Sequence, residues 1–346
     1  MESVLHEEIG EQPAVVAGLL AAEAASIRAI GEQLAQHSIQ YVLIAARGSS
    51  DNAARYAQYL FGMINGLTVA LATPSLFGAY GHPPRLQGAL VIGISQSGQS
   101  PDIVHVLEEA RRQGAPTIAL TNDPHSPLAA AAEHCIALHA GTERSIAATK
   151  TYTTQLAALA LLSLSISPAF AATTSMDAVP AAMRLALESE EQARDAAQRL
   201  AQSDRCVVLG RGFNYATACE IALKIKELTY VVAEPYSSAD FEHGPIAMIE
   251  RGFPVVMVVV GETMRAEMLA LADRLRARGA ALVVLGDDEQ FRHSDDGWIA
   301  VPATLPEWLT PCVAVLPGQL LAYHLAQLRG LNPDRPRALN KVTLTN

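Results

Sequence analysis

The feature that most constrains the fold of this chain is an internal repeat. The dipeptide Arg47-Gly48 follows an apolar run and corresponds to Arg211-Gly212, at an offset of 164. The segment RRQGAPTIALTND around Gly114 corresponds to RARGAALVVLGDD around Gly279, at an offset of 165. An offset that stays almost constant between two distant points favours duplication over chance, and the period is far too long for a solenoid. We therefore expect two copies of one domain.

Within each copy, short apolar runs alternate with helical segments. The apolar runs of the first copy are residues 41–46, 89–94 and 117–120. Those of the second copy are residues 206–210, 254–260 and 281–286. This alternation predicts a parallel sheet covered by helices in each half. The expected fold class is α/β, with two tandem doubly wound, flavodoxin-like domains.

The repeat and its flanking segments divide the chain into four parts. Residues 1–36 are expected to form an N-terminal helical segment, and residues 37–175 the first domain. Residues 176–330 are expected to form the second domain, which opens with a polar helical stretch. Residues 331–346 are rich in proline and then polar, and we expect them to form a C-terminal tail.

Composition excludes several classes of protein. Half of the 346 residues are hydrophobic and 17% are charged, which supports a sizeable core and argues against disorder. A net charge of −10 without a basic stripe makes nucleic acids and anionic membranes poor partners. The N-terminus is acidic and lacks an apolar signal core, and the most apolar run, 156–172, is short for a membrane span. We expect a buried helix there and a cytoplasmic location.

The cysteine pattern indicates no special chemistry. The chain has four cysteines, at Cys135, Cys206, Cys219 and Cys312, and none forms a CxxC pair. This favours buried free thiols in a reducing compartment over a disulfide or a zinc site. The sequence offers no ligand cluster for a metal, and we expect neither a metal nor an organic cofactor.

A serine-rich loop, Ser95-Gln96-Ser97-Gly98-Gln99-Ser100, joins the run 89–94 to a helix that begins at Pro101-Asp102. A strand-to-helix turn offers unpaired amides and the positive end of a helix dipole, which suit a phosphate. Serine hydroxyls add donors, and Gly98 allows the backbone to approach closely. Without a lysine the loop does not match a nucleotide P-loop, so a monophosphate is favoured. Ser49 and Ser50, at the first strand-to-helix turn, would add donors from an adjacent strand.

The alternative is a helix N-cap that happens to be rich in serine. Three serines and a glycine exceed what capping requires. The corresponding segment of the second copy, Val260-Gly261-Glu262-Thr263, has lost the serines and gained an acid. If the serines served only the fold, both copies should keep them. The pattern therefore favours a phosphate site.

The second copy and the tail carry candidate acid–base residues. Glu220, Lys224 and Glu227 are spaced to lie on one helix face beside an apolar stripe. From this spacing alone, a solvated ion pair on the helix surface is the commoner interpretation. His243, before Gly-Pro, stands at a break where it could move protons near neutral pH, although a single histidine is more often structural. Lys341 could form an imine with a carbonyl substrate if the tail folds over it.

Several longer motifs together resemble a known family. They are EIGEQP near the N-terminus, ARGSS, SQSGQSPD, GTERSIAATKTYTTQL, the segment running from GRG through ALKIKEL to EHGPIAMIE, and DRPRALNKVTLTN at the C-terminus. Across nearly the whole chain they resemble the sugar isomerase (SIS) half of glucosamine-6-phosphate synthase and the stand-alone SIS-type glucosamine-6-phosphate deaminases. The set is highly specific, although each motif alone is weak.

The resemblance implies which residues bind the substrate. The sugar phosphate would be bound by Ser49, Ser50, Ser95, Gln96, Ser97 and Ser100. The loop that contacts the sugar would contain Glu143, Ile146 and Ala148. Ala148 stands where the family usually has a serine, which removes one hydroxyl from the sugar site.

The resemblance also implies catalytic roles. Glu227 would be the base that moves a proton between C1 and C2, and Lys224 would support the charges of ring opening. His243 would assist ring opening from a second subunit, which implies a homodimer with a shared active site. Lys341 would be the tail lysine that can form an imine with the ketose.

The implied reaction converts glucosamine 6-phosphate and water into fructose 6-phosphate and ammonia. The synthase's glutaminase uses a cysteine just after the initial methionine, whereas this chain has Glu2 there and its first cysteine at Cys135. We therefore expect no glutamine hydrolysis by that route. The enzymatic alternative is a fructosamine-6-phosphate deglycase or another amino-sugar-phosphate isomerase.

Two alternatives come from other classes. A non-catalytic sugar-phosphate sensor would need a DNA-binding segment, and the first 36 residues are too few and too acidic to supply one. A plain scaffold would not explain why one copy alone keeps the serines. The amino-sugar epimer and the physiological direction stay open.

Overall fold

The computed structural model describes residues 3–172, 174–302, 304–338 and 341. The chain forms two compact units, which are described separately. Unit 1 contains Met1–Pro13, Arg144–Thr149 and Ala178–Leu339. Unit 2 contains Ala14–Glu143, Lys150–Asp177 and Asn340–Asn346. The N-terminal segment 1–36 is thus divided between the units, and most of the tail belongs to unit 1.

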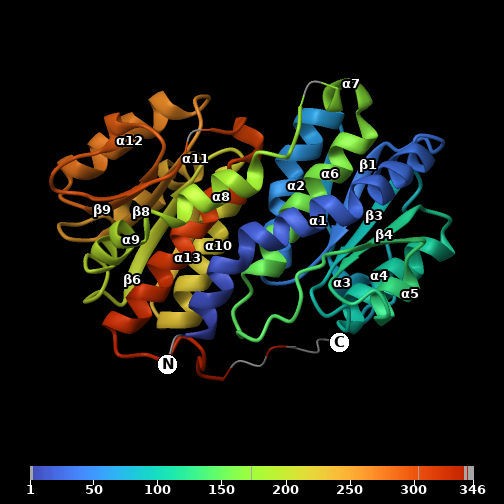
Figure 1. Cartoon of the computed structure of the whole chain (residues 1–346), viewed down its shortest axis with the longest axis horizontal. Helices are drawn as coiled ribbons and strands as arrows, with labels where there is room; N and C mark the ends of the chain where they lie inside the picture. The colour runs from blue at the N-terminus through green and yellow to red at the C-terminus, as the bar shows by residue number, and fades with distance from the viewer. Residues whose placement is uncertain (1–2, 173, 303, 339–340, 342–346) are drawn as a thin grey trace. The chain divides into compact units, whose positions relative to one another are not determined.

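Unit 2 is built on a five-stranded parallel sheet in the order β2-β1-β3-β4-β5 (Figure 1). Its strands are β1 (Tyr41–Ala45), β2 (Thr68–Leu71), β3 (Ala89–Ile94), β4 (Thr117–Thr121) and β5 (His134–Ala137). The order reverses direction between β1 and β3, as in flavodoxin-like folds. The predicted doubly wound α/β architecture is confirmed for this half.

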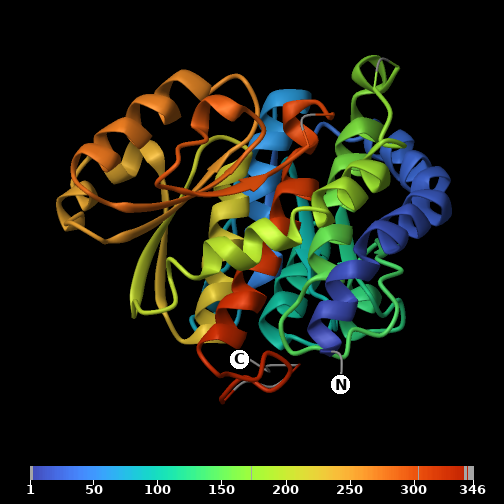
Figure 2. The ribbon, with the colours of Figure 1, turned by 60° about the vertical axis from the view of Figure 1, so that its left-hand side comes forward.

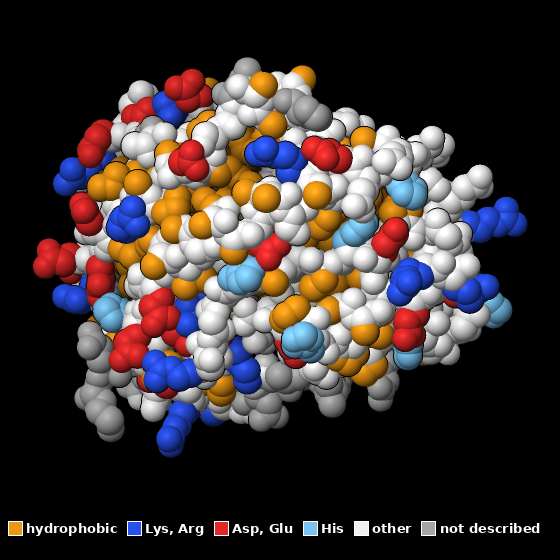
Figure 3. Space-filling view, turned by 45° about the vertical axis from the view of Figure 1, so that its right-hand side comes forward, with side chains coloured by type: hydrophobic (Ala, Val, Ile, Leu, Met, Phe, Trp, Pro, Cys, Tyr) orange, Lys and Arg blue, Asp and Glu red, His pale blue; other side chains and the backbone are white. Residues whose placement is uncertain are grey.

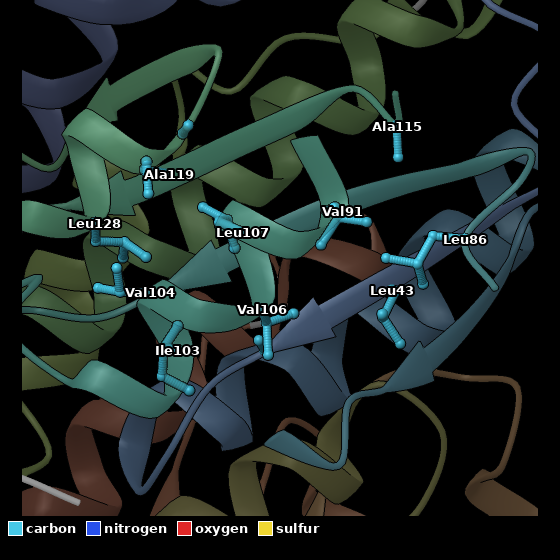
Figure 4. Close-up of a cluster of buried hydrophobic side chains, with 14 of the residues drawn as sticks. Leu43, Leu86, Val91, Ile103, Val104, Val106, Leu107, Ala115, Ala119 and Leu128 are labelled. Atoms are coloured by element: carbon cyan, nitrogen blue, oxygen red, sulfur yellow. The ribbon is translucent and has the colours of Figure 1, made fainter. Parts of the chain in front are cut away.

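Helices cover both faces of this sheet. They are α2 (Ser49–Asn65), α3 (Pro74–Phe77), α4 (Pro101–Arg112), α5 (Pro127–Ala131), α6 (Lys150–Ile166), α7 (Pro168–Ala171) and most of α1 (Val4–Leu34). Leu43 and Val91 from the strands pack with Ile103 and Leu107 from α4 and with Leu128 from α5 (Figure 4). Because α4 begins directly after the serine loop, this packing fixes the position of the loop.

Unit 1 repeats the arrangement with the order β10-β9-β8-β6-β7. Its strands are β6 (Arg205–Gly210), β7 (Val232–Ser237), β8 (Pro254–Val259), β9 (Ala281–Gly286) and β10 (Gly297–Ala300). Counted from the first strand of each half, the two orders are the same. The structure therefore confirms two tandem parallel-sheet domains.

The helices of unit 1 also lie on both faces of its sheet. They are α8 (Val179–Leu187), α9 (Glu190–Ala197), α10 (Asn214–Thr229), α11 (Ser238–Glu242), α12 (Arg265–Ala277) and α13 (Pro311–Leu328), with short 3-10 turns at Pro245–Met248, Glu289–Phe291 and Glu307–Leu309. Figure 2 shows α12, in orange, on one face and α13, in red, on the other. Gly318 of α13 lets α10 come close, because a Cβ at that position would collide with Ile221.

Sequence reasoning missed the edge strands β2, β5, β7 and β10. These strands have exposed or half-buried positions, whereas every residue of β3 is buried. An edge strand has one neighbour and one open side, so it need not be a continuous apolar run. Pro235 within β7 fits this edge position, since proline cannot donate a ladder hydrogen bond.

Among the described helices, α1 is long and apolar enough to cross a membrane, by length and composition alone. The sequence had drawn attention to residues 156–172 instead, and most of α6 is indeed buried. Of the most apolar window of α1, 28% is buried. Its first turns carry the buried Glu8, whose carboxylate accepts hydrogen bonds from the amides of Arg144 (2.6 Å) and Ser145 (3.0 Å). On the face shown in Figure 3, acidic and basic side chains lie interspersed.

Candidate active site

The serine loop lies at the carboxyl end of β3, next to the point where the strand order of unit 2 reverses. Ser95 is buried, and Gln96, Ser97 and Ser100 are half-buried. Ser49 and Ser50 begin α2 directly after the neighbouring strand β1. Ligands of doubly wound sheets bind outside the carboxyl ends of the strands at this point. The structure thus brings the predicted phosphate-binding residues of unit 2 to one edge of the sheet.

Three of these serines accept a hydrogen bond from the protein. Ser95 Oγ accepts from the Gly98 amide (3.1 Å) and Ser97 Oγ from the Gln99 amide (3.3 Å). Ser50 Oγ accepts from Gln155 Nε2 (2.9 Å). A hydroxyl that accepts in this way keeps its own hydrogen for donation. Since a phosphate oxygen is an acceptor, the arrangement suits an anion better than a cation.

The loop is more than a helix cap. Ser100 occupies the N-cap position of α4, yet its side chain makes no capping hydrogen bond. Gly98 has φ +62°, and a Cβ there would collide with Ser126 Oγ. Glycine is therefore required both by conformation and by space. These observations count against the N-cap alternative.

The corresponding turn of unit 1 is occupied by the protein's own carboxylates. The amide of Gly261 donates to Asp287 Oδ2 (2.9 Å). The amide and hydroxyl of Thr263 donate to Glu307 Oε2 (3.2 and 2.6 Å). The duplicated turn thus keeps its affinity for negative charge, but in unit 1 the fold itself supplies the anion. In unit 2 the serines replace such internal partners.

Glu143 and Lys341, both predicted site residues, form an ion pair within unit 2. Lys341 Nζ lies 2.7 Å from Glu143 Oε2, and the Glu143 side chain is fully buried whereas that of Lys341 is 25% exposed. Glu143 also accepts from the amide (3.2 Å) and hydroxyl (2.9 Å) of Thr151, in the first turn of α6. The carboxylate therefore holds the tail amine against this unit.

In unit 1, α10 carries a charge group that is buried rather than solvated. The side chains of Glu220 and Lys224 are 0% and 1% exposed, and that of Glu227 is 24% exposed. Lys224 Nζ lies 2.6 Å from Glu227 Oε2 and 3.4 Å from Glu220 Oε1. The expectation of a solvated surface pair, which spacing alone favoured, is wrong. The helix α10 packs on α13 and on the strands β6 and β7, and its own sequence does not reveal these neighbours.

Burial and charge act on Lys224 in opposite directions. Burial alone would lower the pKa of its ammonium, but the carboxylates of Glu220 and Glu227 outweigh burial and raise it. Lys224 therefore stays charged throughout the neutral range. A permanently charged lysine can hold a carboxylate and stabilise negative charge, but it cannot act as the base. Of the two carboxylates, Glu227 is the one that a substrate can reach.

The remaining predicted residues lie on unit 1. His243 is exposed at the end of α11, and no hydrogen bond among the described residues joins it to Glu227. Gly244, with φ +150°, adopts a conformation that favours glycine, which explains the His-Gly-Pro break. Ile146 and Ala148 are half-buried in the segment Arg144–Thr149.

Sequence reasoning missed four residues that the structure places beside the predicted ones. They are Arg47, Asp102, Thr151 and Gln155. Each contacts a predicted residue or flanks the serine loop. The one available signal was position, since Arg47 and Asp102 lie within the ARGSS and SQSGQSPD motifs.

Among the described residues, neither the cysteines nor a group of metal-binding side chains forms a further site. Burial raises the pKa of Cys206 and of Cys312 to about 12. Burial, with Glu23 and Asp123 nearby, also raises the pKa of Cys135, which is half-buried rather than buried as expected. In the part of the chain that the structure describes, no group of three or more histidine, cysteine, aspartate or glutamate side chains is placed to hold a metal ion.

Comparison with known proteins places these features in a family. A family model for the SIS domain matches residues 37–165 and 199–329. The isomerizing glutamine–fructose-6-phosphate aminotransferase of Pyrococcus horikoshii is 35% identical over 98% of this chain and 57% of its own length. The chain thus spans little more than half the length of the curated relatives it matches.

Solved structures agree with this assignment. A protein from Silicibacter pomeroyi assigned as a phosphosugar isomerase is similar with a TM-score of 0.87 and 33% identity, over 96% of this chain and 100% of that one. The C-terminal domain of glucosamine-fructose-6-phosphate aminotransferase from Francisella tularensis also gives a TM-score of 0.87, with 26% identity over 97% and 99% of the two chains. The two matched segments coincide with the two parallel-sheet domains, and the chain belongs to the SIS domain family.

Proposed function

We propose that this protein is an amino-sugar-phosphate isomerase that converts glucosamine 6-phosphate and water into fructose 6-phosphate and ammonia. The observation that carries the proposal is the charge group on α10. There a fully buried, permanently charged Lys224 holds a reachable carboxylate, Glu227, at 2.6 Å. Such a pair fits a base that must take a proton from carbon while the substrate develops negative charge.

The proposed proton transfer runs from C2 to C1 of the opened sugar. Glu227 removes the proton from C2, and the electron pair shifts toward C1 and O1 to give an enolamine. Returning the proton to C1, while O1 gains one proton and the amine nitrogen loses one, yields the imine at C2. Water adds to that imine, and the C2–N bond breaks to give the ketose and ammonia. Lys224 stabilises the developing negative charge without exchanging its own proton.

Binding is proposed to rest on unit 2. The hydroxyls of Ser50, Ser95 and Ser97 keep hydrogens to donate to the phosphate, together with amides of the loop. The Glu143–Lys341 pair supports a role of the tail amine near a sugar carbonyl, because the carboxylate holds the amine in one place. Ala148 is proposed to remove a contact to the sugar. The assay described below measures which amino-sugar phosphate is the preferred substrate.

Ammonia is proposed to leave as a free molecule. The thiols of Cys135, Cys206 and Cys312 have pKa values raised by burial. Such environments disfavour the thiolate that a glutamine-cleaving nucleophile needs. We also propose a homodimer, in which the exposed His243 serves the site of a second copy, and a cytoplasmic location.

The test is an ammonia-release assay on glucosamine 6-phosphate, its epimers and fructosamine 6-phosphates. Wild-type protein should release ammonia from glucosamine 6-phosphate with formation of fructose 6-phosphate. Glu227→Gln should abolish turnover while binding of fructose 6-phosphate stays within about twofold of wild type, because that change removes the base and not the phosphate contacts. Turnover confined to fructosamine 6-phosphates would favour the deglycase alternative, and normal turnover by Glu227→Gln would refute the assignment of the base.

A further inference from the structure

Arg47 and Asp102 form an ion pair beside the serine loop. Arg47 lies just after β1, and Asp102 lies in the first turn of α4. Arg47 Nε and Nη2 lie 3.0 and 2.8 Å from Asp102 Oδ2. The aspartate side chain is 5% exposed and that of the arginine is 54% exposed. A buried carboxylate thus anchors a guanidinium that still faces solvent.

Sheet register places Arg47 level with the start of the loop. Ala45 of β1 pairs with Gly93 of β3. Arg47 and Ser95 each follow that paired position by two residues. Since neighbouring parallel strands end at the same edge, both residues lie where the strand order reverses. The guanidinium therefore belongs to the same edge of unit 2 as the proposed phosphate site.

A cation would improve the charge balance of this edge when a phosphate is bound. The loop contains no lysine, and the carboxylate of Asp102 would repel a dianionic phosphate bound nearby. Arg47 compensates that carboxylate. A guanidinium has five N–H donors, and Asp102 Oδ2 engages two of its nitrogens. Among the described residues the Arg47 side chain has no other partner, so donors remain for a ligand.

The duplicated half shows that the pair is not simply inherited. Arg211 and Glu267 hold the corresponding positions in unit 1, and their closest charged atoms are 3.9 Å apart. Glu267 is 66% exposed there, and Arg211 Nη1 donates instead to Ser237 Oγ (3.3 Å). The close pair with a buried carboxylate occurs in the half that keeps the serines.

We propose that Arg47 binds the phosphate of the substrate directly and that Asp102 is the positioning residue that holds it. The inference rests on the proposed phosphate site and adds the fixed positive charge that the serines cannot supply. It makes Arg47 a residue that selects phosphorylated over unphosphorylated sugars, because a neutral sugar gains nothing from the guanidinium.

The first experiment titrates the full chain with fructose 6-phosphate at low and high ionic strength. Arg47→Gln should weaken binding about tenfold to hundredfold at low salt, as expected for the loss of a charge-assisted hydrogen bond. The difference from wild type should shrink at about 0.5 M salt, where charges are screened. Arg112→Gln, which removes an exposed charge at the other end of α4, should bind like wild type. Arg47→Lys should bind better than Arg47→Gln.

The second experiment uses the positioning residue. Arg47→Gln leaves the Asp102 carboxylate uncompensated, so adding Asp102→Asn should restore part of the lost affinity. If both changes acted only on the structure, the double variant would bind more weakly than either single variant. In turnover, Arg47→Gln should raise KM with little change in kcat, since the phosphate contact is the same in ground and transition states. Thermal melts check that each variant folds.

The outcomes separate this inference from the proposed function. If Ser97→Ala weakens binding but Arg47→Gln binds within about twofold of wild type, the phosphate site stands and the role of Arg47 is refuted. A loss that is independent of salt, or a double variant weaker than Arg47→Gln, also refutes it. If wild type binds neither fructose 6-phosphate nor inorganic phosphate, the proposed function and this inference both fail.

Discussion

Replacing Lys224 with methionine removes the ammonium that lies between two carboxylates on α10. Methionine matches the length of the side chain, so packing is largely kept and the change isolates the charge. Glu220 is 0% exposed and would lose the ammonium that lies 3.4 Å from its carboxylate. Breaking a buried ion pair from one side costs about 3–5 kcal/mol. For a unit of this size, that corresponds to a fall in Tm of about 6–20 °C.

The assay is thermal melting followed by circular dichroism at neutral and at mildly acidic pH. The loss should be smaller at acidic pH, because a stranded carboxylate can take up a proton. Lys224→Met combined with Glu220→Leu should recover much of the loss, since replacing a whole buried pair by apolar residues is often neutral. Glu227→Gln is the matched control, and its more exposed side chain should cost far less stability.

Two results would refute this reasoning. A fall in Tm of less than about 2 °C for Lys224→Met would mean that the ammonium is not enclosed. An additive loss in the Lys224→Met, Glu220→Leu double variant would mean that the two charges do not compensate each other.

The raised pKa of Lys224 also sets the direction in which the stability of wild type depends on pH. Its contribution is complete below the unfolded value of about 10.4 and is lost only as pH rises through the folded value, so stability from this pair should be flat across the neutral range.

Three further changes test the loop, the tail and a buried histidine. Gly98 has φ +62° and a Cβ there would collide with Ser126, so Gly98→Ala should abolish phosphate binding and lower Tm. If this variant bound phosphate like wild type, that result would contradict the loop geometry. Asp334 accepts two amides of the first turn of α1, so Asp334→Ala should cost about 1 kcal/mol in a denaturant titration, and no loss would contradict this cap. Burial lowers the pKa of His324, so its contribution is present above the unfolded value of about 6.5 and is lost as pH falls. His324→Gln should therefore flatten the fall in Tm between about pH 7 and pH 5, and an unchanged slope would exclude His324 as its source.

Much of the fold could be predicted from the sequence because the repeat and the central strands are local patterns. The runs at 89–94 and 254–260 are buried throughout, so composition alone identifies them. The edge strands could not be predicted in this way, because their residues alternate between buried and exposed positions. Their pairing depends on which neighbour the rest of the sheet presents.

The candidate site likewise has features that could be predicted from local sequence and features that could not. The serine loop was recognisable because strand, turn and helix follow one another directly in the chain. The α10 charge group was misjudged from spacing, since i, i+4 and i+7 positions look alike on a surface helix and on a buried one. Burial of Lys224 and Glu220 depends on the elements that pack around α10, among them α13, which lies about ninety residues further along.

By itself the sequence determined that the chain is duplicated, that each half is a parallel α/β domain, and that one half alone carries a hydroxyl-lined turn. These features depend on residue type and short-range spacing. Only the tertiary structure decided that Glu227 rather than Glu220 is reachable, that Asp287 and Glu307 fill the turn of unit 1, and that Asp102 holds Arg47 beside the serines. The exposure and charge pairing of these side chains depend on segments that are distant in the chain, so they cannot be predicted from local sequence.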